Sequence, residues 1–226
     1  MATGGAGHAE LQVVSALLAV PVPDEVDDES AAFTTIAAIA LQGLRLAELQ
    51  AGARVCVVGL GLVGQLTVRL AQASGLQVVG IDINPWNVER AASSCLALVE
   101  EGDATTEAIL AWSRGQGVDA VLVTAAASTS DPMLRAPAIA RDRATIVLVG
   151  DVGMEMKRTP LYEKELTVRV ARSYGPGRYD RSYEDWGVDY PLGHVRWTEG
   201  RNMEAVLEHG WLVDKPASGR TTRRRR

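Results

Sequence analysis

The chain of 226 residues is long enough to bury one sizeable core. It is 47% hydrophobic and 23% charged, as expected of a soluble globular protein, and its net charge of −5 gives no reason to expect a nucleic-acid partner. Two cysteines, Cys56 and Cys95, make neither a disulfide framework nor a zinc spacing. No stretch reaches the roughly 20 apolar residues of a membrane span, so we expect a cytoplasmic protein without a membrane partner.

The first part of the chain shows little regular periodicity. Residues 1–23 are predicted to be irregular or extended and end in PVP. The acidic run DEVDDES then offers helix N-caps ahead of a largely apolar helix, predicted from about Glu29 to Leu46. A helix that is apolar nearly all round must be covered on several faces.

Strand and helix patterns alternate through the middle of the chain. Strands are predicted at 55–58, 77–81, 97–99, 118–124 and 144–150, with a weaker one at 165–171, and helices at 62–74, 85–94, 105–114 and 131–140. This alternation predicts an α/β fold, a doubly wound parallel sheet of the Rossmann type, as a single domain over 24–172 with irregular N- and C-terminal extensions. A last helix is predicted at 202–209, and the basic tail 211–226 is expected to be disordered.

A glycine motif follows the first strand of this sheet. Gly59, Gly61 and Gly64 form G-x-G-x-x-G between an apolar strand and an amphipathic helix, and the next strand ends at Asp82. Gly59 permits a tight turn, Gly61 lets a pyrophosphate approach the backbone, and Gly64 allows close packing of helix on sheet. Asp82 is positioned to bind ribose hydroxyls, and no Lys or Arg in the next seven residues would attract a 2′-phosphate. NAD is therefore the predicted cofactor, in preference to NADP.

Further cofactor contacts are expected where the chain enters the helix and leaves the strands, because ligands bind beyond the carboxyl ends of parallel strands. These are Leu62, Val63, Ile83, Thr124, Ala125, Val149 and Gly150. The alternative is that the glycines only serve tight turns in an α/β fold that binds no nucleotide.

The segment SYGPGRYDRSYEDWGVDYPLGHVRW, residues 173–197, is rich in aromatic and charged residues. Tyr174, Arg178 and Tyr179 are candidate substrate contacts, since Arg can bind a carboxylate or phosphate and Tyr can stack on a sugar. His194 is a candidate proton shuttle. The same residue types also serve packing and partner interfaces, and this alternative stays open. No catalytic residue is identified, because no triad, carboxylate pair or Y-x-x-x-K dyad can be found.

These motifs resemble those of a known superfamily. AGHAE, VPVPDEVDDESAAFTTIAAIALQG, VGLGLVGQLTVRLAQASG and VVGIDIN are similar to medium-chain alcohol dehydrogenases and reductases. VDAVLVTAAA, IVLVGDVG, LYEKEL and SYGPGRYD, with YP-x-G-x-VRWTE-x-RNM after them, resemble the alcohol-dehydrogenase-like half of bacterial bi-domain oxidoreductases.

The resemblance implies hydride transfer between a nicotinamide and a small alcohol, carbonyl or sugar-like substrate. It also implies that residues 1–23 are the remnant of a GroES-like substrate domain and that a second Rossmann domain is missing. Residues 173–210 would then be an extension facing a substrate or an absent domain. No Cys/His cluster supports the zinc site of some members. The second hypothesis is a catalytically silent nucleotide-binding or assembly module, completed by a partner chain or as a homo-oligomer.

Overall fold

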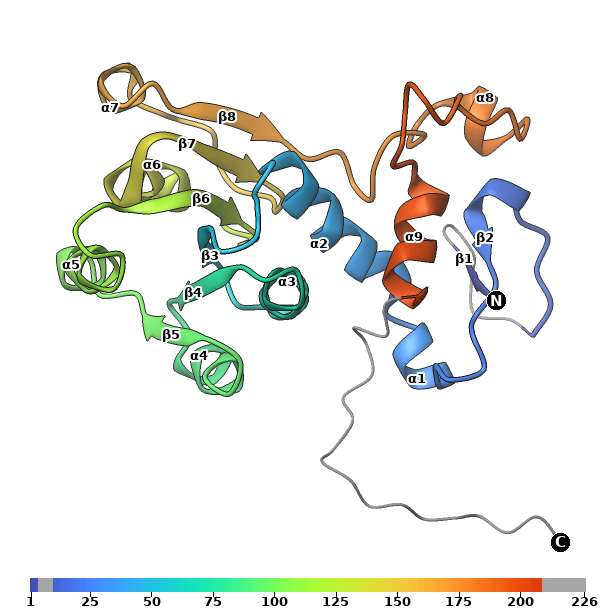
Figure 1. The fold of residues 1–226 in the computed structure, drawn as a ribbon, viewed down its shortest axis with the longest axis horizontal. Helices are drawn as coiled ribbons and strands as arrows, with labels where there is room; N and C mark the ends of the chain where they lie inside the picture. The colour runs from blue at the N-terminus through green and yellow to red at the C-terminus, as the bar shows by residue number, and fades with distance from the viewer. Residues whose placement is uncertain (4–9, 209–226) are drawn as a thin grey trace, which may run out of the picture.

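Six parallel strands form one central sheet in the structure, a computed structural model that describes residues 1–3 and 10–208. The strands are β3 (Arg54–Val58), β4 (Gln77–Asp82), β5 (Leu96–Val99), β6 (Val118–Val123), β7 (Ala140–Leu148) and β8 (Thr167–Val170). Their spatial order is β5-β4-β3-β6-β7-β8, so the direction of winding reverses between β3 and β6 (Figure 1). His8, His209 and the predicted tail 211–226 lie outside the described residues.

Helices cover both faces of the sheet, which explains why the central strands are apolar on both sides. They are α3 (Leu62–Ala73), α4 (Pro85–Ala91), α5 (Asp103–Trp112), α6 (Asp131–Ile139) and the short α7 (Arg158–Glu163). Val55 and Val57 point into one core, shared with α3 and α4, whereas Cys56 points into the other, shared with α5 and α6. The doubly wound α/β fold predicted from the sequence is confirmed.

The predicted helix from Glu29 to Leu46 is split into α1 (Asp28–Ala31) and α2 (Thr34–Leu46). Asp27 caps α1, and its side chain accepts a hydrogen bond from the Ser30 N–H at 2.7 Å. The Thr34 hydroxyl donates to the Ala31 carbonyl at 2.7 Å, which bridges the break. The acidic run therefore starts a separate short helix instead of the first turn of the long one.

The two terminal extensions contain short elements that pack together beside the sheet (Figure 1). We call them the helical lobe. It comprises β1 (Ala2–Thr3), the 3₁₀ helix η1 (Ala16–Leu18), β2 (Ala19–Val20), α1, α8 (Arg181–Glu184) and α9 (Glu199–Glu208), together with the segments 171–180 and 185–198 on either side of α8. β1 and β2 pair antiparallel, and α9 contacts η1 and β2.

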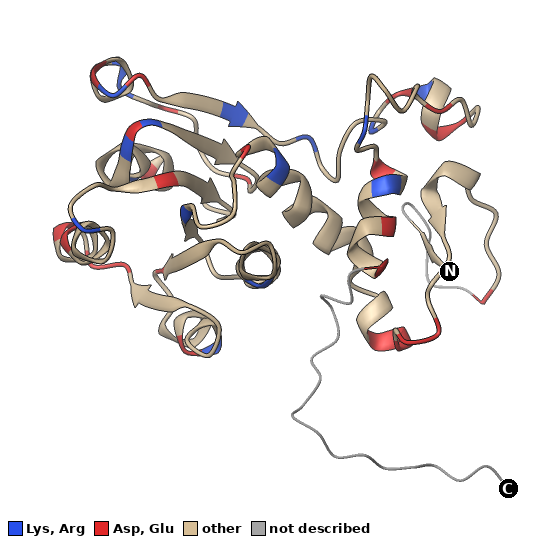
Figure 2. Ribbon diagram, in the orientation of Figure 1, with Lys and Arg blue, Asp and Glu red and all other residues tan. Residues whose placement is uncertain are grey.

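Helix α2 joins the helical lobe to the sheet, because it packs against both α3 and α9. Ala37, Ala38 and Ala40 are fully buried along it. The ribbon of α2 carries no charged residue until Arg45 in its last turn (Figure 2). This composition follows from its position, because a charge on either side of α2 would be removed from water.

Candidate functional site

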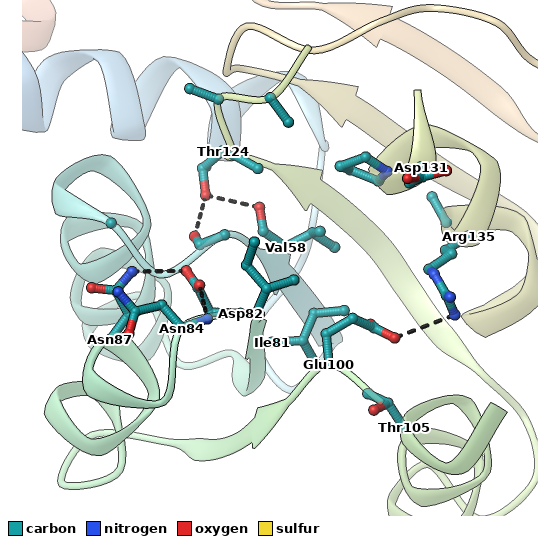
Figure 3. A pocket seen from close by; sticks show the side chains of 18 of the residues that line it. Val58, Ile81, Asp82, Asn84, Asn87, Glu100, Thr105, Thr124, Asp131 and Arg135 are labelled. Atoms are coloured by element: carbon teal, nitrogen blue, oxygen red, sulfur yellow. Dashed lines mark hydrogen bonds and ion pairs between the residues drawn. The ribbon is translucent and has the colours of Figure 1, made fainter. Parts of the chain in front are cut away.

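A cleft of about 870 Å³ opens at the carboxyl ends of β3, β4 and β6 (Figure 3). This is the edge of the sheet where the winding direction reverses, the usual ligand position in doubly wound folds. Eight residues predicted from the sequence line it: Gly59, Gly61, Leu62, Val63, Asp82, Ile83, Thr124 and Ala125.

The three glycines of the motif occupy different environments. Gly59 has φ +93°, a conformation that favours glycine, and a Cβ there would also overlap the backbone of Ala125. A Cβ on Gly64 would overlap the carbonyl oxygen of Gly59. A Cβ on Gly61 would meet no atom within 4 Å, because this position faces the open cleft. Gly59 and Gly64 are thus required for packing, and Gly61 leaves space.

The first turn of α3 presents backbone donors to this space. Gly61 is its N-cap residue and has no side chain, so within the described chain no side chain caps the turn. The Thr124 hydroxyl donates to the Gly59 carbonyl at 2.6 Å and ties the glycine loop to the end of β6. Free N–H groups and the positive end of the helix dipole make such a turn suited to a phosphate.

Asp82 ends β4 at the side of the cleft (Figure 3). Its carboxylate accepts hydrogen bonds from the backbone N–H groups of Leu60, at 2.6 Å, and Asn84, at 2.7 Å. The side-chain amide of Asn87 donates to it at 3.1 Å. Ile83, 82% exposed, forms an apolar lip next to it. The position can bind a hydroxyl-bearing sugar, with an apolar surface beside it for a base.

The far end of the cleft holds an ion pair that the sequence motif did not reveal. Arg135 on α6 lies 3.2 Å from Glu100, which directly follows β5 (Figure 3). The Glu100 carboxylate also accepts from the Gly102 N–H at 2.8 Å. Its place just after a strand is the signal that could have identified Glu100, whereas Arg135 sits on a helix and leaves no such signal.

Three predicted cofactor residues lie behind the cleft wall. Gly64, Val149 and Gly150 do not line it. Val149 packs its side chain against Gly43 of α2, and a Cβ on Gly150 would overlap the Ala125 carbonyl. These contacts are packing contacts of the strand ends, and a cofactor contact by these three residues stays a prediction.

The aromatic segment is not brought to this cleft. Tyr174, Arg178, Tyr179 and His194 lie in the segments before and after α8, and none of them lines the cleft. Tyr174 is 5% exposed, and its carbonyl accepts from the Asn202 side chain at 2.7 Å. Arg178 pairs with Glu184 at 2.5 Å. Tyr179 and His194 are exposed. These contacts support the packing interpretation for Tyr174 and Arg178, whereas a substrate role of Tyr179 and His194 stays a prediction.

Glu199, at the start of α9, is a buried carboxyl group in the same lobe. It is 0% exposed, and burial raises its pKa to about 7. The negative charge of Glu184 adds to the shift, whereas the Tyr174 hydroxyl and Arg178 oppose it. Burial also raises the pKa of Tyr174. Neither oxygen of the Glu199 carboxyl group has a hydrogen-bond partner among the described residues, nor does the side-chain oxygen of Asn202.

Metal ligands do not gather in the described part of the chain. Over residues 1–3 and 10–208, no three His, Cys, Asp or Glu side chains come together in an arrangement that could hold a metal. Cys56 is buried in β3 and Cys95 is half-buried, and burial raises the pKa of both thiols, that of Cys95 to about 11. The same described residues contain no helix long and apolar enough to cross a membrane.

The chain is similar to several known dehydrogenases and reductases. It is 27% identical over 178 residues to (R,R)-butanediol dehydrogenase of Bacillus subtilis, covering 77% of this chain and 51% of that one. It is 30% identical over 174 residues to D-xylulose reductase of Saccharomyces cerevisiae, covering 72% and 48%. Galactitol-1-phosphate dehydrogenase of Escherichia coli shares the fold with a TM-score of 0.70 at 21% identity, over 93% of this chain and 58% of that one.

The chain spans about half the length of these relatives. Residues 63–186, more than half of the chain, match the family described as zinc-binding dehydrogenase. The matched range contains the strands β4 to β8 and begins after β3 and after Gly59 and Gly61 of the glycine motif. The chain therefore belongs to the zinc-binding dehydrogenase family, within the medium-chain dehydrogenase/reductase superfamily, and carries its Rossmann half.

Proposed function

We propose that this chain is the NAD-binding part of an oxidoreductase that acts on a small alcohol or carbonyl compound, including sugar-like ones. The observation that carries the proposal is the uncapped first turn of α3 at a cleft of about 870 Å³, with Asp82 on the neighbouring strand. The relatives named for butanediol, xylulose and galactitol-1-phosphate support the substrate class. When bound, the nicotinamide supplies a hydride acceptor or donor at its C4 carbon.

The residues of the cleft have separate roles in this proposal. The N–H groups of the α3 first turn bind the pyrophosphate, with Gly61 leaving it room. Asp82 accepts from the adenosine ribose, and Ile83 packs against the base. Thr124 keeps the glycine loop in place through its bond to Gly59.

NAD is proposed over NADP on electrostatic grounds. The Asp82 carboxylate would repel a 2′-phosphate, and Arg135, the one basic residue that lines the described cleft, is paired with Glu100. Solved structures of relatives hold either cofactor: one from Escherichia coli was determined with NADH and one from Sinorhizobium meliloti with NADP. Titration of the purified chain with both cofactors measures the preference.

The proposal does not include a zinc ion. Zinc is bound by thiolate, imidazole and carboxylate ligands, and burial keeps the thiols of Cys56 and Cys95 protonated. Metal analysis of the purified chain tests this part: one bound zinc per chain would contradict it. We expect the affinity for NADH to be unchanged by a chelator.

Binding is tested with a matched pair of glycine variants. Gly61→Ala places a methyl group in the open space of the cleft, and Gly193→Ala places one in open space in the helical lobe. We expect both to melt within about 2 °C of the native chain, because neither methyl group meets a neighbour. Gly61→Ala should raise the Kd for NADH at least tenfold, measured by calorimetry, and Gly193→Ala should leave it unchanged. Equal affinities, or no binding by the native chain, would contradict the proposal.

A second function is favoured by one observation. No His, Cys, Lys or Tyr lines the described cleft, and the ionisable side chains that line it are four carboxyl groups and Arg135. The chain would then be a nucleotide-binding module that is silent alone and completed by a partner chain. Turnover of alcohols, aldehydes and sugars by the purified chain separates the two functions, since only the first predicts product without a partner.

A further inference from the structure

The carboxylate of Asp82 accepts hydrogen bonds from three internal donors, of which Asn84 and Asn87 are labelled in Figure 3. Its Oδ2 atom accepts from the Leu60 N–H at 2.6 Å and from Nδ2 of Asn87 at 3.1 Å. Its Oδ1 atom accepts from the Asn84 N–H at 2.7 Å. Since a carboxylate offers about four acceptor positions, roughly one remains for a ligand, and it lies on Oδ1.

Asn87 is itself fixed in place from the opposite side. It lies in α4, and its backbone carbonyl accepts from the Gln65 side chain at 3.0 Å. The same Gln65 amide donates to the Leu60 carbonyl at 3.0 Å. Gln65, Asn87, Asp82 and Leu60 thus form a closed circuit of hydrogen bonds that connects α3, α4, the end of β4 and the glycine loop.

The circuit determines how the Asn87 amide is oriented. A carboxylate can only accept, so the amide must turn its nitrogen toward Asp82. Two backbone N–H groups and one neutral amide then satisfy the carboxylate without any cation. The Asp82 carboxylate therefore has a defined orientation in the cleft, and no positively charged side chain is among these three donors.

We propose that Asn87 is a specificity-determining residue: it orients the Asp82 carboxylate so that the cleft selects a nucleotide with a free ribose hydroxyl and rejects one with a 2′-phosphate. This inference rests on the proposed cofactor function. Asn87 acts through Asp82 and is a positioning residue. Without the Asn87 amide, the Asp82 carboxylate loses one of the two donors on Oδ2. It then rotates, and Oδ1 no longer points toward the ribose hydroxyl.

The experiment replaces Asn87 by Leu, which has nearly the same shape and cannot donate. Glu89→Leu is the matched control, because Glu89 is an exposed residue of the same helix. We expect Asn87→Leu to raise the Kd for NADH about tenfold, the effect of losing a donor to a charged acceptor. The Kd for NADPH should change less than threefold, because that nucleotide has no 2′-hydroxyl. The control should change neither.

Equal weakening of both cofactors with a lowered melting temperature would show a purely structural role and overturn the inference. So would an unchanged Kd for NADH. A crystal structure of the unliganded Asn87→Leu protein gives a readout that is independent of binding. We expect the Asp82 carboxylate to be rotated there, and an unchanged carboxylate overturns the inference. Failure of the native chain to bind either cofactor contradicts the proposed function and leaves the result on carboxylate orientation to stand by itself.

Discussion

The cleft and the helical lobe use polar chemistry in opposite ways. In the cleft, the groups suited to binding are backbone N–H groups, one glycine facing open space and one carboxylate with an acceptor position left. In the helical lobe, Gly177 is closed in by Tyr183, and the Tyr183 hydroxyl donates to Thr198 at 3.0 Å. Two tyrosines of the aromatic segment, Tyr174 and Tyr183, are therefore buried in packing, whereas the small and backbone groups of the cleft remain open to a ligand.

The largest expected effect is a loss of stability at Gly64, which packs against the glycine loop beside the cleft. Gly64→Ala forces a methyl group into the carbonyl oxygen of Gly59, a clash that only a backbone shift can relieve. We expect the free energy of unfolding to fall by roughly 3 kcal/mol, measured by urea denaturation. Gly193→Ala is the control, and a midpoint equal to that of the control would show that the two glycines do not differ in packing.

A smaller effect is expected at the buried carboxyl of the helical lobe. The folded-state pKa of Glu199 is raised to about 7 from an ordinary 4.5, so the folded state holds its proton more tightly than the unfolded state does. Its contribution is fully favourable below the ordinary value and is lost as pH rises through about 7. Between pH 5.5 and 8 the native chain should lose roughly 1–2 kcal/mol through this group.

Glu199→Gln should remove this part of the pH dependence, because an amide does not titrate in the range. Glu204→Gln is the control, since Glu204 is exposed on the same helix. Denaturant unfolding at four pH values measures the slopes. Parallel profiles for the native chain and Glu199→Gln would contradict the assignment. The affinity for NADH should be equal in both variants, since Glu199 is not among the residues that line the cleft.

The smallest expected effect concerns the exposed aromatic residue of the segment 173–197. Tyr179 is 69% exposed, and the Arg178 guanidinium lies over its ring, 4.4 Å from the ring centroid. Tyr179→Ala should change stability by less than about 0.5 kcal/mol and the Kd for NADH by less than twofold. A tenfold loss of NADH affinity would show that the segment 173–197 takes part in nucleotide binding. It would contradict the contrast between the cleft and the helical lobe.

The fold could be predicted because its signal is local. Apolar strands alternate with helical periods, and the glycine motif marks the turn between the first pair. The start of β7 was harder to predict from the sequence. The strand begins at Ala140 and not at 144, because the residues after Ala140 are polar and Arg141 pairs with Asp119 at the exposed end of the strand. A polar strand end has no apolar pattern to reveal it.

The site could be predicted only in part, for a different reason. The motif identified the phosphate turn and Asp82, which occur at fixed places in the pattern. The pairing of Glu100 with Arg135 and the hold of Asn87 on Asp82 depend on how separate elements approach one another. The aromatic segment was a candidate by composition alone, and composition does not tell whether a Tyr such as Tyr174 points to a ligand or to the interior.

Helix α2 has a mechanical consequence. Its 13 residues make a rod of about 20 Å that is buried against α3 at the sheet and against α9 in the helical lobe. Rotation of one lobe against the other requires a hinge, usually a few residues at a loop or element end. Because the same unbroken helix packs against the sheet and against the helical lobe, such a rotation would bend α2 or separate it from α3 or α9. We therefore expect the sheet and the helical lobe to move together, without a hinge inside α2.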